Sequence, residues 1–282
     1  MNVVSGTRTR TRVCGRRAGL VFGLFTAALV SWIGSAAAQQ KESHLDRVVR
    51  SMKLRVCIWP EYYAISYKNP RTGQLEGIDI DIAKELAGEL KAQLEFVESG
   101  FQAFIADLQA DKCDIGMFGV GATLARARAV EFSDPYLITS IYGVTKKDHP
   151  KIKSWNDMDQ DGIVVATQLG SYVDSFMKPY LKKAKVLSVQ PPATREGEVA
   201  AGRADILMTD YPVAKKLEAT QEWARIINPV EPLAVTPYAY VVAPGDQVWL
   251  NYINLFVRTI KRDGRLLNAA KKNGLEPIVT LN

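Results

Sequence analysis

The chain has 282 residues, with 36 Lys or Arg against 30 Asp or Glu and a formal net charge of +6. The first 38 residues carry five arginines and no acidic residue, so the remaining 244 residues (282 less 38) hold 31 basic and 30 acidic side chains. A nearly neutral chain without a basic face and interleaved aromatic residues is not expected to bind nucleic acid. Its length is sufficient for two lobes of ordinary domain size.

The N-terminus has the pattern of an export signal. Arginines up to Arg17 precede an apolar run at 18–33, and small residues at 36–38 precede Gln39. Such a pattern predicts cleavage close to Gln39, and an apolar run of about 16 residues is short for a membrane span. Cys14 lies before the apolar run and is therefore not a lipidation site. We expect a periplasmic protein of a Gram-negative bacterium, with general secretory and twin-arginine export both open.

Few residues suited to metal binding or nucleophilic catalysis follow the export signal. Cys57 falls late in one predicted parallel strand and Cys113 at the start of another, an offset that would hold the two sulfurs too far apart to bridge. We therefore expect two free, half-buried thiols, although export permits a disulfide. His44 and His149 are the only histidines, which argues against a His-based metal site or a nucleophile–histidine pair. No metal and no cofactor are expected.

The first half of the chain alternates between predicted helices and strands. The expected elements are a helix at 45–52, a strand at 54–58, a helix at 80–90, a strand at 94–97 and a helix at 101–110. A turn-rich segment with Trp59 and Tyr62 follows the first strand. Open α/β sheets place their ligands at such carboxyl ends of strands, so both aromatic residues are candidates for the site.

The stretch 113–136 carries the clearest chemical pattern. A short strand at 114–118 breaks at Gly119 and Gly121, and one helical turn then begins before the turn at 133–135. This arrangement brings unpaired backbone N–H groups and the guanidinium of Arg126 together, as in an anion site. The alternative is an ordinary strand-to-helix connection with a solvated arginine.

The second half of the chain again predicts strands alternating with helices. The expected elements are strands at 163–167, 186–189 and 205–209, with helices at 172–182, 196–202 and from 211. Crossings near 137–141 and 235–238 would form a hinge between two lobes. A last helix, capped by Asp246, has apolar residues at helical spacing and should pack back onto the first lobe; they are Trp249, Ile253, Phe256, Val257 and Ile260.

The stretch 113–136 resembles the signature of the amino-acid-type periplasmic solute-binding proteins of family 3, commonly Gly-Met-Thr-x-Thr-x-Glu-Arg followed by Val-Asp-Phe-Ser-Asp-Pro-Tyr. The matching positions are Thr123, Arg126, Val130, Phe132, Ser133, Asp134, Pro135 and Tyr136. Further matching pieces are found at 54–56, 62, 77–83, 170–171 and 204–210.

The resemblance extends from about residue 43 to the end and implies an α/β, two-lobe type II periplasmic-binding-protein fold. Each lobe would be a mainly parallel sheet flanked by helices, and a two-strand hinge would join the lobes. The expected divisions are a signal peptide at 1–38, lobe 1 at 39–138 and 237–282, and lobe 2 at 139–236.

The same resemblance implies a site for an amino acid. Arg126 would hold the α-carboxylate with help from Ser171, and Asp210 would bind the ammonium group together with the carbonyl of Gly119. Ser171 and Asp210 have the alternative role of helix N-caps. The other expected ligand-binding residues are Trp59, Tyr62, Phe101, Gly121, Gln168 and Tyr172.

Two of these residues depart from the family pattern. Gly121 replaces a usual threonine and would open room in the pocket, while Trp59 replaces a polar residue and would extend an aromatic wall. The aligned pocket shows no second arginine for a side-chain carboxylate. An aromatic, large apolar or cationic side chain is therefore expected on the ligand.

The resemblance favours a monomeric binding protein of an ABC importer, with an inner-membrane permease as partner and without enzymatic activity. Cyclohexadienyl (arogenate/prephenate) dehydratases, which share the fold, are an alternative because 43–48 and 202–205 resemble theirs. Their general-acid glutamate matches Val173, which cannot transfer a proton, and Asp174 points about 100° further round the helix. A binding protein associated with a periplasmic quinoprotein dehydrogenase is a further alternative.

Overall fold

The computed structural model describes residues 42–282, so the expected signal peptide and its cleavage point lie outside the described residues. None of the helices in this part of the chain is long and apolar enough to cross a membrane. The described residues form two mixed sheets with flanking helices and one small three-stranded sheet.

The first sheet has a parallel core that antiparallel strands extend. Its order is β5 (Gln93–Glu98), β1 (Lys53–Ile58), β6 (Ile115–Gly121), β14 (Thr236–Val242) and β7 (Glu131–Phe132), and β8 (Leu137–Thr139) also pairs with β14. Strands β5, β1 and β6 are parallel, whereas β14 runs antiparallel to its three neighbours. All residues of β6 are buried, as expected for a central strand covered on both faces.

Five helices belong to this half of the structure. They are α1 (His44–Ser51), α2 (Ile78–Glu89), α3 (Phe104–Gln109), α7 (Gln247–Arg262) and α8 (Arg265–Lys272). The short strands β2 (Glu61–Tyr62), β3 (Ser66–Lys68) and β4 (Leu75–Glu76) form the three-stranded sheet that precedes α2.

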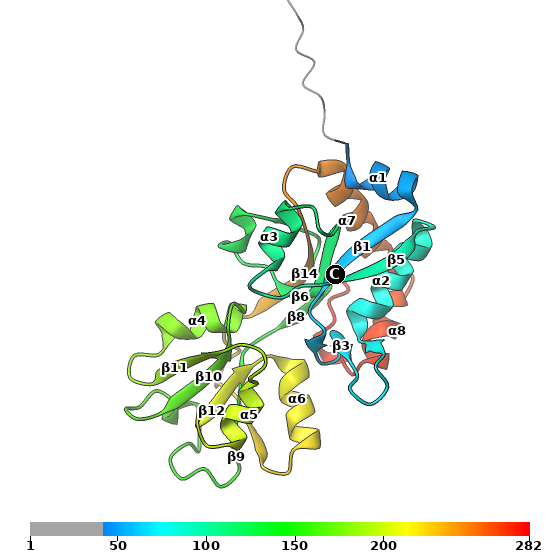
Figure 1. Cartoon of the computed structure of the whole chain (residues 1–282). Helices are drawn as coiled ribbons and strands as arrows, with labels where there is room; N and C mark the ends of the chain where they lie inside the picture. The colour runs from blue at the N-terminus through cyan, green and yellow to red at the C-terminus, as the bar shows by residue number, and fades with distance from the viewer. Residues whose placement is uncertain (1–41) are drawn as a thin grey trace, which may run out of the picture. The chain divides into compact units, whose positions relative to one another are not determined.

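The second sheet is built from the middle of the chain. Its order is β11 (Lys185–Val189), β10 (Val164–Gln168), β12 (Ile206–Thr209), β9 (Tyr142–Lys146) and β13 (Ala224–Ile227). The first three strands are parallel, and β9 is antiparallel to both of its neighbours. Helices α4 (Tyr172–Tyr180), α5 (Arg195–Ala200) and α6 (Tyr211–Thr220) gather around it in Figure 1. Three 3-10 turns complete the fold: η1 (Arg126–Arg128), η2 (Trp155–Asp157) and η3 (Glu276–Ile278).

The chain passes between the two sheets twice, as the sequence predicts. It leaves the first sheet after β8 and returns at β14, and these two strands pair with each other at Thr139 and Thr236. We call the elements around the first sheet lobe 1 and those around the second sheet lobe 2. The predicted divisions at 138/139 and 236/237 fall within β8 and β14, and their exact positions remain predictions.

Helix α7 returns the C-terminal part of the chain to the first sheet. The Asp246 carboxylate accepts a hydrogen bond from the Trp249 backbone N–H at 3.0 Å and so caps the helix. All five predicted core residues of this helix are buried. The indole N–H of Trp249 donates to the carbonyl of Asp114, just before β6, at 2.8 Å. The predicted packing of this helix on lobe 1 is confirmed.

The prediction of two free, half-buried thiols is wrong. Cys57 and Cys113 form a disulfide with their Cα atoms 5.6 Å apart, and both residues are fully buried. The prediction failed because it placed Cys113 inside a strand. In the structure β6 begins only at Ile115, and the chain reaches Cys113 through a bend at Asp111, which has a left-handed φ of 58°. The strand offset therefore does not fix the separation of the two sulfurs.

Candidate functional site

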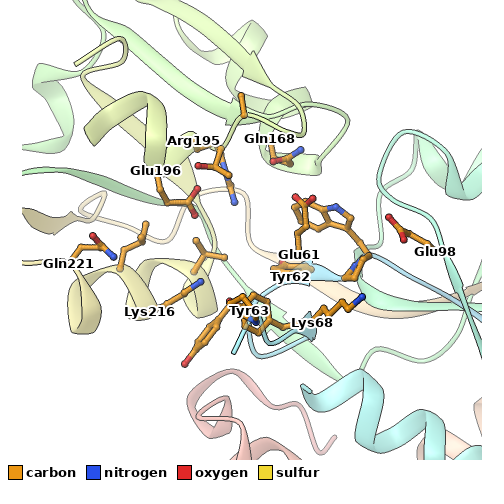
Figure 2. Close-up of a pocket in the computed structure, with 18 residues that line it drawn as sticks. Glu61, Tyr62, Tyr63, Lys68, Glu98, Gln168, Arg195, Glu196, Lys216 and Gln221 are labelled. Carbon is orange, nitrogen blue, oxygen red and sulfur yellow. The ribbon is translucent and has the colours of Figure 1, made fainter. Parts of the chain in front are cut away.

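Two neighbouring cavities lie where strands of both sheets end. The inner cavity, of about 20 Å³, is lined by Trp59, Tyr62, Phe101, Gln168, Ser171, Tyr172, Val173, Arg195, Thr209, Asp210 and Tyr238. The outer cavity measures about 630 Å³ and shares Trp59, Tyr62, Gln168 and Arg195 with the inner one (Figure 2). Seven of the ten predicted site residues line the inner cavity. The other three, Gly119, Gly121 and Arg126, lie on or directly after β6.

Asp210 stands at the N-cap position of α6, but its side chain makes no capping hydrogen bond. Instead its carboxylate accepts hydrogen bonds from the hydroxyl of Tyr62 and, at 2.7 Å, from that of Tyr238. The two phenol oxygens are 2.9 Å apart. Burial, together with the charge of Asp210, holds the pKa of both phenols well above the usual range. They therefore stay protonated and act as donors to a buried anion.

Arg126 connects the two lobes through its guanidinium. One terminal nitrogen donates to the carbonyl of Gly121 and the other to the carbonyl of Gly170, each at 2.9 Å. The guanidinium carbon also lies 5.7 Å and 5.4 Å from the ring centroids of Phe101 and Phe104. Burial lowers the pKa of Arg126 to about 10, so the group remains charged at neutral pH. It has no carboxylate partner among residues 42–282.

Ser171 has the capping geometry that the sequence left as an alternative. Its hydroxyl oxygen accepts a hydrogen bond from the backbone N–H of Asp174 at 3.1 Å, at the start of α4. The backbone N–H of Ser171 donates to the carbonyl of Gln168 at 3.1 Å. The side chain is buried at the inner cavity, where its hydroxyl hydrogen can still be donated to a ligand.

The two glycines of β6 allow aromatic rings to approach the strand. Gly119 has a left-handed φ of 62°, and a Cβ there would lie 2.9 Å from the ring of Tyr62. At Gly121 a Cβ would lie 3.0 Å from the side chain of Thr236 and 3.2 Å from the ring of Tyr172. The expectation that Gly121 opens room is therefore wrong, because the ring of Tyr172 fills that space.

The predicted aromatic wall is present. The ring centroids of Trp59 and Tyr62 are 5.6 Å apart, and that of Phe101 lies 5.0 Å from the first and 5.8 Å from the second. Across the cavity, the ring of Tyr172 is 6.0 Å from that of Tyr238. Tyr238 was not predicted, since its position in a crossover strand does not by itself indicate a contact with a ligand.

Arg195 was also missed, and its presence contradicts the expectation of a pocket without a second arginine. This first residue of α5 is only 7% exposed and lines both cavities. Its position directly after the N-cap Thr194 would equally suit a solvated surface arginine. The sequence therefore gives no sign that the side chain turns inward.

The outer cavity carries charges of both signs. Glu61 and Glu98 face it from lobe 1 and Glu196 from lobe 2 (Figure 2). Burial, followed by repulsion from Glu98 and Glu196, raises the pKa of Glu61. Lys216 of α6 places its ammonium nitrogen 4.7 Å from the ring centroid of Tyr63, so lobe 2 also contacts lobe 1 at this cavity.

Asp79 lies fully buried behind the site. Its carboxylate accepts a hydrogen bond from the N–H of Gly119 at 2.8 Å and from the hydroxyl of Tyr136 at 2.7 Å. The second carboxylate oxygen has no partner among the described residues. Burial raises the pKa of Asp79 to about 7 despite these hydrogen bonds.

Away from both cavities, His44, Asp111 and Asp114 have ligand atoms close enough for a metal ion. Arg47 contacts both carboxylates, and Arg55 lies 3.1 Å from Asp111 and 2.8 Å from Asp114. Two guanidinium groups already compensate the two acids. We interpret this cluster as an ion-pair network that joins α1 to the start of β6.

The chain matches a family model described as bacterial extracellular solute-binding proteins, family 3, over residues 54–276. A relative named cyclohexadienyl dehydratase, from Pseudomonas aeruginosa, is 29% identical over 240 residues, covering 85% of this chain and 89% of the relative. The ABC transporter glutamine-binding protein GlnH of Bacillus subtilis is 26% identical over 242 residues, covering 85% and 87%.

Solved structures show the same fold. The ancestral amino acid-binding protein AncCDT-1, described as a precursor of cyclohexadienyl dehydratase, is 35% identical with a TM-score of 0.76, covering 82% of this chain and 99% of its own. A mutant of ArgBP from T. maritima is 27% identical with a TM-score of 0.74, covering 81% and 97%. The predicted type II periplasmic-binding-protein fold is confirmed.

The expectation that the protein is not an enzyme does not hold. A relative that aligns over most of the chain is named as a dehydratase, and a structural neighbour is described as the precursor of that enzyme. Enzymatic activity therefore belongs among the functions for which this protein has to be tested.

Proposed function

Since this chain belongs to family 3 of the bacterial extracellular solute-binding proteins, we propose that it binds an amino acid or a close relative between its two lobes. It would deliver this ligand to an ABC permease in the inner membrane. The glutamine-, cystine- and arginine-binding relatives support an amino-acid ligand.

The observation that carries the proposal is a pair of opposite charges beside one cavity: Asp210 lines the inner cavity, and Arg126 contacts the ring of Phe101, which also lines it. Arg126 comes from lobe 1 and Asp210 from lobe 2, and both lie against the aromatic wall. A zwitterion needs an anion acceptor and a cation acceptor with an apolar surface for its side chain. Buried charge pairs of this kind bind strongly when the ligand completes their hydrogen bonds.

Ligand entry requires the lobes to separate. The inner cavity of about 20 Å³ is too small for an amino acid, since roughly 10 to 15 Å³ of such volume is needed to hold a single water molecule. The contacts of Tyr62 with Asp210 and of Arg126 with Gly170 join the lobes and would have to part. The lobes would separate by rotation about the two connecting segments, one directly after β8 and the other directly before β14, as in hinge closure around a ligand.

The test is a calorimetric screen of the twenty L-amino acids against the exported protein. We expect saturable binding of at least one of them, with one ligand per chain. Solution scattering should then show a smaller radius of gyration at saturating ligand than without ligand. Absence of saturable binding across the whole panel would contradict the proposal.

Cyclohexadienyl dehydration is a second candidate function, favoured by the dehydratase relative that covers 85% of this chain. Val173, which the resemblance aligns with the general-acid glutamate of those enzymes, is buried at the inner cavity. The same cavity is also lined by three tyrosines, Tyr62, Tyr172 and Tyr238, whose hydroxyl groups could donate a hydrogen bond to a substrate. Formation of phenylpyruvate from prephenate by the purified protein would establish the enzyme, and a rate equal to that of buffer would exclude this activity.

We also propose that the protein acts as a monomer in the periplasm after cleavage close to Gln39. A relative named as an arginine-binding periplasmic protein, from Mannheimia haemolytica, supports this location. Mass spectrometry of the periplasmic fraction should find a mature N-terminus at or near Gln39. An intact N-terminus, or an acylated Cys14, would contradict it.

A further inference from the structure

Among residues 42–282, Arg195 is a buried cation that lacks an anionic partner. One terminal nitrogen donates to the carbonyl of Met208 at 3.1 Å and to the hydroxyl of Thr209 at 3.2 Å. Its Nε atom is buried without a hydrogen-bond partner in the described part of the chain. No carboxylate there lies within 4.0 Å of the guanidinium, since none of the ion pairs involves this residue. Figure 2 shows the side chain directed into the space between the lobes.

A guanidinium held in this way is costly. Removing a charge from water without a compensating partner costs several kcal/mol, so buried charges in proteins are usually paired or bound to a ligand. Two neutral oxygens on one nitrogen compensate only part of this cost, and no group of the described chain accepts a hydrogen bond from Nε. A ligand bound at the cavity would be able to supply the missing hydrogen bonds.

The other charges in or next to the inner cavity do not neutralise Arg195. The carboxylate of Asp210 lines the cavity and accepts hydrogen bonds from Tyr62 and Tyr238, and the guanidinium of Arg126, against the lining ring of Phe101, adds a second positive charge. Two guanidinium groups and one carboxylate give the site a formal charge of +1. A zwitterionic amino acid with a neutral side chain would engage Arg126 and Asp210 and leave Arg195 uncompensated.

We infer that Arg195 binds a second acidic group of the ligand, so that the ligand is an amino acid or close relative with an anionic side chain. This inference rests on the proposed function, because it assumes that the cavity between the lobes holds an amino acid. The planar fork of an arginine suits two parallel hydrogen bonds to a carboxylate. Arg126 would hold one acidic group from lobe 1 and Arg195 the other from lobe 2.

The acidic residues of the outer cavity are arranged consistently with this inference. Glu61, Glu98 and Glu196 line only the outer cavity, and none of them lines the inner one. The acidic group of a ligand at Arg195 would lie on the inner side of these carboxylates, next to Ser171 and Thr209, which offer hydroxyl groups rather than charge.

The experiment compares amino acids that differ in side-chain charge but hardly in shape. Calorimetry would measure L-glutamate against L-glutamine and L-aspartate against L-asparagine, on the unmodified protein and on three variants. Arg195→Gln removes the charge, and Arg195→Lys keeps the charge but not the fork. Arg203→Gln is the matched control, because Arg203 follows the same helix with its side chain 63% exposed and paired with Glu198.

We expect the unmodified protein to bind the anionic member of at least one pair more than 30-fold more tightly than its amide. Arg195→Gln should reduce that ratio to less than threefold while changing amide affinity by less than threefold. Arg195→Lys should show a ratio between those of the unmodified protein and Arg195→Gln. Arg203→Gln should show the same ratio as the unmodified protein. Measuring the ratio makes the result independent of a uniform loss of binding through altered packing.

Two results would overturn the inference and leave the proposed function standing. One is an unmodified protein that binds a neutral or cationic amino acid as tightly as any anionic one. The other is a ratio that Arg195→Gln leaves unchanged. If Arg195→Gln fails to fold, the ratio of anionic to amide affinity can still be measured for the unmodified protein and for Arg195→Lys. These two ratios then test the inference. If no amino acid of the twenty binds, the proposed function and this inference both fail.

Discussion

The hydroxyl of Tyr62 donates a hydrogen bond to the carboxylate of Asp210, although the two residues are 148 positions apart and belong to different lobes. Tyr238, on the strand that returns to lobe 1, donates to the same carboxylate. A ligand ammonium group that binds Asp210 therefore enters a site where two phenols already contribute. In this closed arrangement the two phenols hold the carboxylate in place, so that closure of the lobes around a ligand would itself orient Asp210.

Replacing either charged residue of the proposed zwitterion site should weaken binding strongly. For Arg126→Ala and Asp210→Ala we expect losses of about 2 to 5 kcal/mol, because truncating one partner of a buried charge pair leaves the other charge unpaired. That corresponds to roughly 30-fold to several thousand-fold in affinity, measured by calorimetry. Arg128→Ala is the matched control, since Arg128 lies exposed on the same short turn. A loss below threefold for Arg126 or Asp210 would remove that residue from the site.

Restoring the threonine that the family usually has at position 121 should damage the site. In Gly121→Thr the new side chain would press on the ring of Tyr172, which a Cβ would already approach to 3.2 Å. Overpacking of this kind costs about 1 to 3 kcal/mol in the free energy of unfolding. We expect a lower midpoint in urea unfolding together with weaker binding.

A glycine in open space provides the control for this substitution. A Cβ added at Gly88 in α2 would meet no atom within 4 Å beyond its own helix backbone and chain neighbours, and Gly88 has no positive φ. Gly88→Ala should therefore leave binding unchanged and stabilise the helix by roughly 0.5 to 1 kcal/mol. Equal stability of Gly121→Thr and the unmodified protein would show that Tyr172 can move aside.

Asp79 should make the stability of the protein depend on pH. Its pKa rises from 3.8 in the unfolded reference to about 7 in the folded protein because of burial. The folded state therefore retains this proton where the unfolded state has lost it. Its stabilising contribution is full below about pH 4, falls as the pH rises to about 7, and does not change further above that value.

The variant Asp79→Asn isolates this contribution, since an amide stays neutral at every pH. The variant should become more stable relative to the unmodified protein between about pH 4 and 7, by up to about 4 kcal/mol at 1.36 kcal/mol per pKa unit. Urea unfolding at a series of pH values measures the difference. If the difference in unfolding free energy between the two proteins stays constant from about pH 4 to 7, Asp79 is ionised in the folded protein over that range.

The disulfide should contribute measurably to stability. It closes a loop of 56 residues in sequence separation, and for loops of this size the loss of chain entropy in the unfolded state typically gives about 2 to 5 kcal/mol. Thermal unfolding with and without a thiol reductant should show a lower midpoint in the reduced protein. The double variant Cys57→Ala, Cys113→Ala should no longer respond to reductant, and an equal midpoint in both conditions would count against the bridge.

The local pattern of the sequence was sufficient for much of the fold and for part of the site. Two patterns lie within short stretches of the sequence. One is the apolar spacing of α7 with its Asp246 cap, and the other is the order of strand, glycine and arginine around Gly119 and Arg126. Hydrophobic periodicity and capping depend on contacts within a turn or two of the chain, and so they can be predicted without the tertiary structure. Asp210 was predicted on a resemblance of the same local kind.

Only the tertiary structure decided which distant groups meet. The Cys57–Cys113 bridge depends on a bend before β6, and the inward direction of Arg195 depends on how α5 packs beside β12. Likewise, Tyr238 reaches Asp210 only because its strand returns beside β6. Such contacts are set by the placement of strands, helices and bends relative to one another, which involves many weak interactions spread over the whole chain. No short stretch of residues encodes that placement.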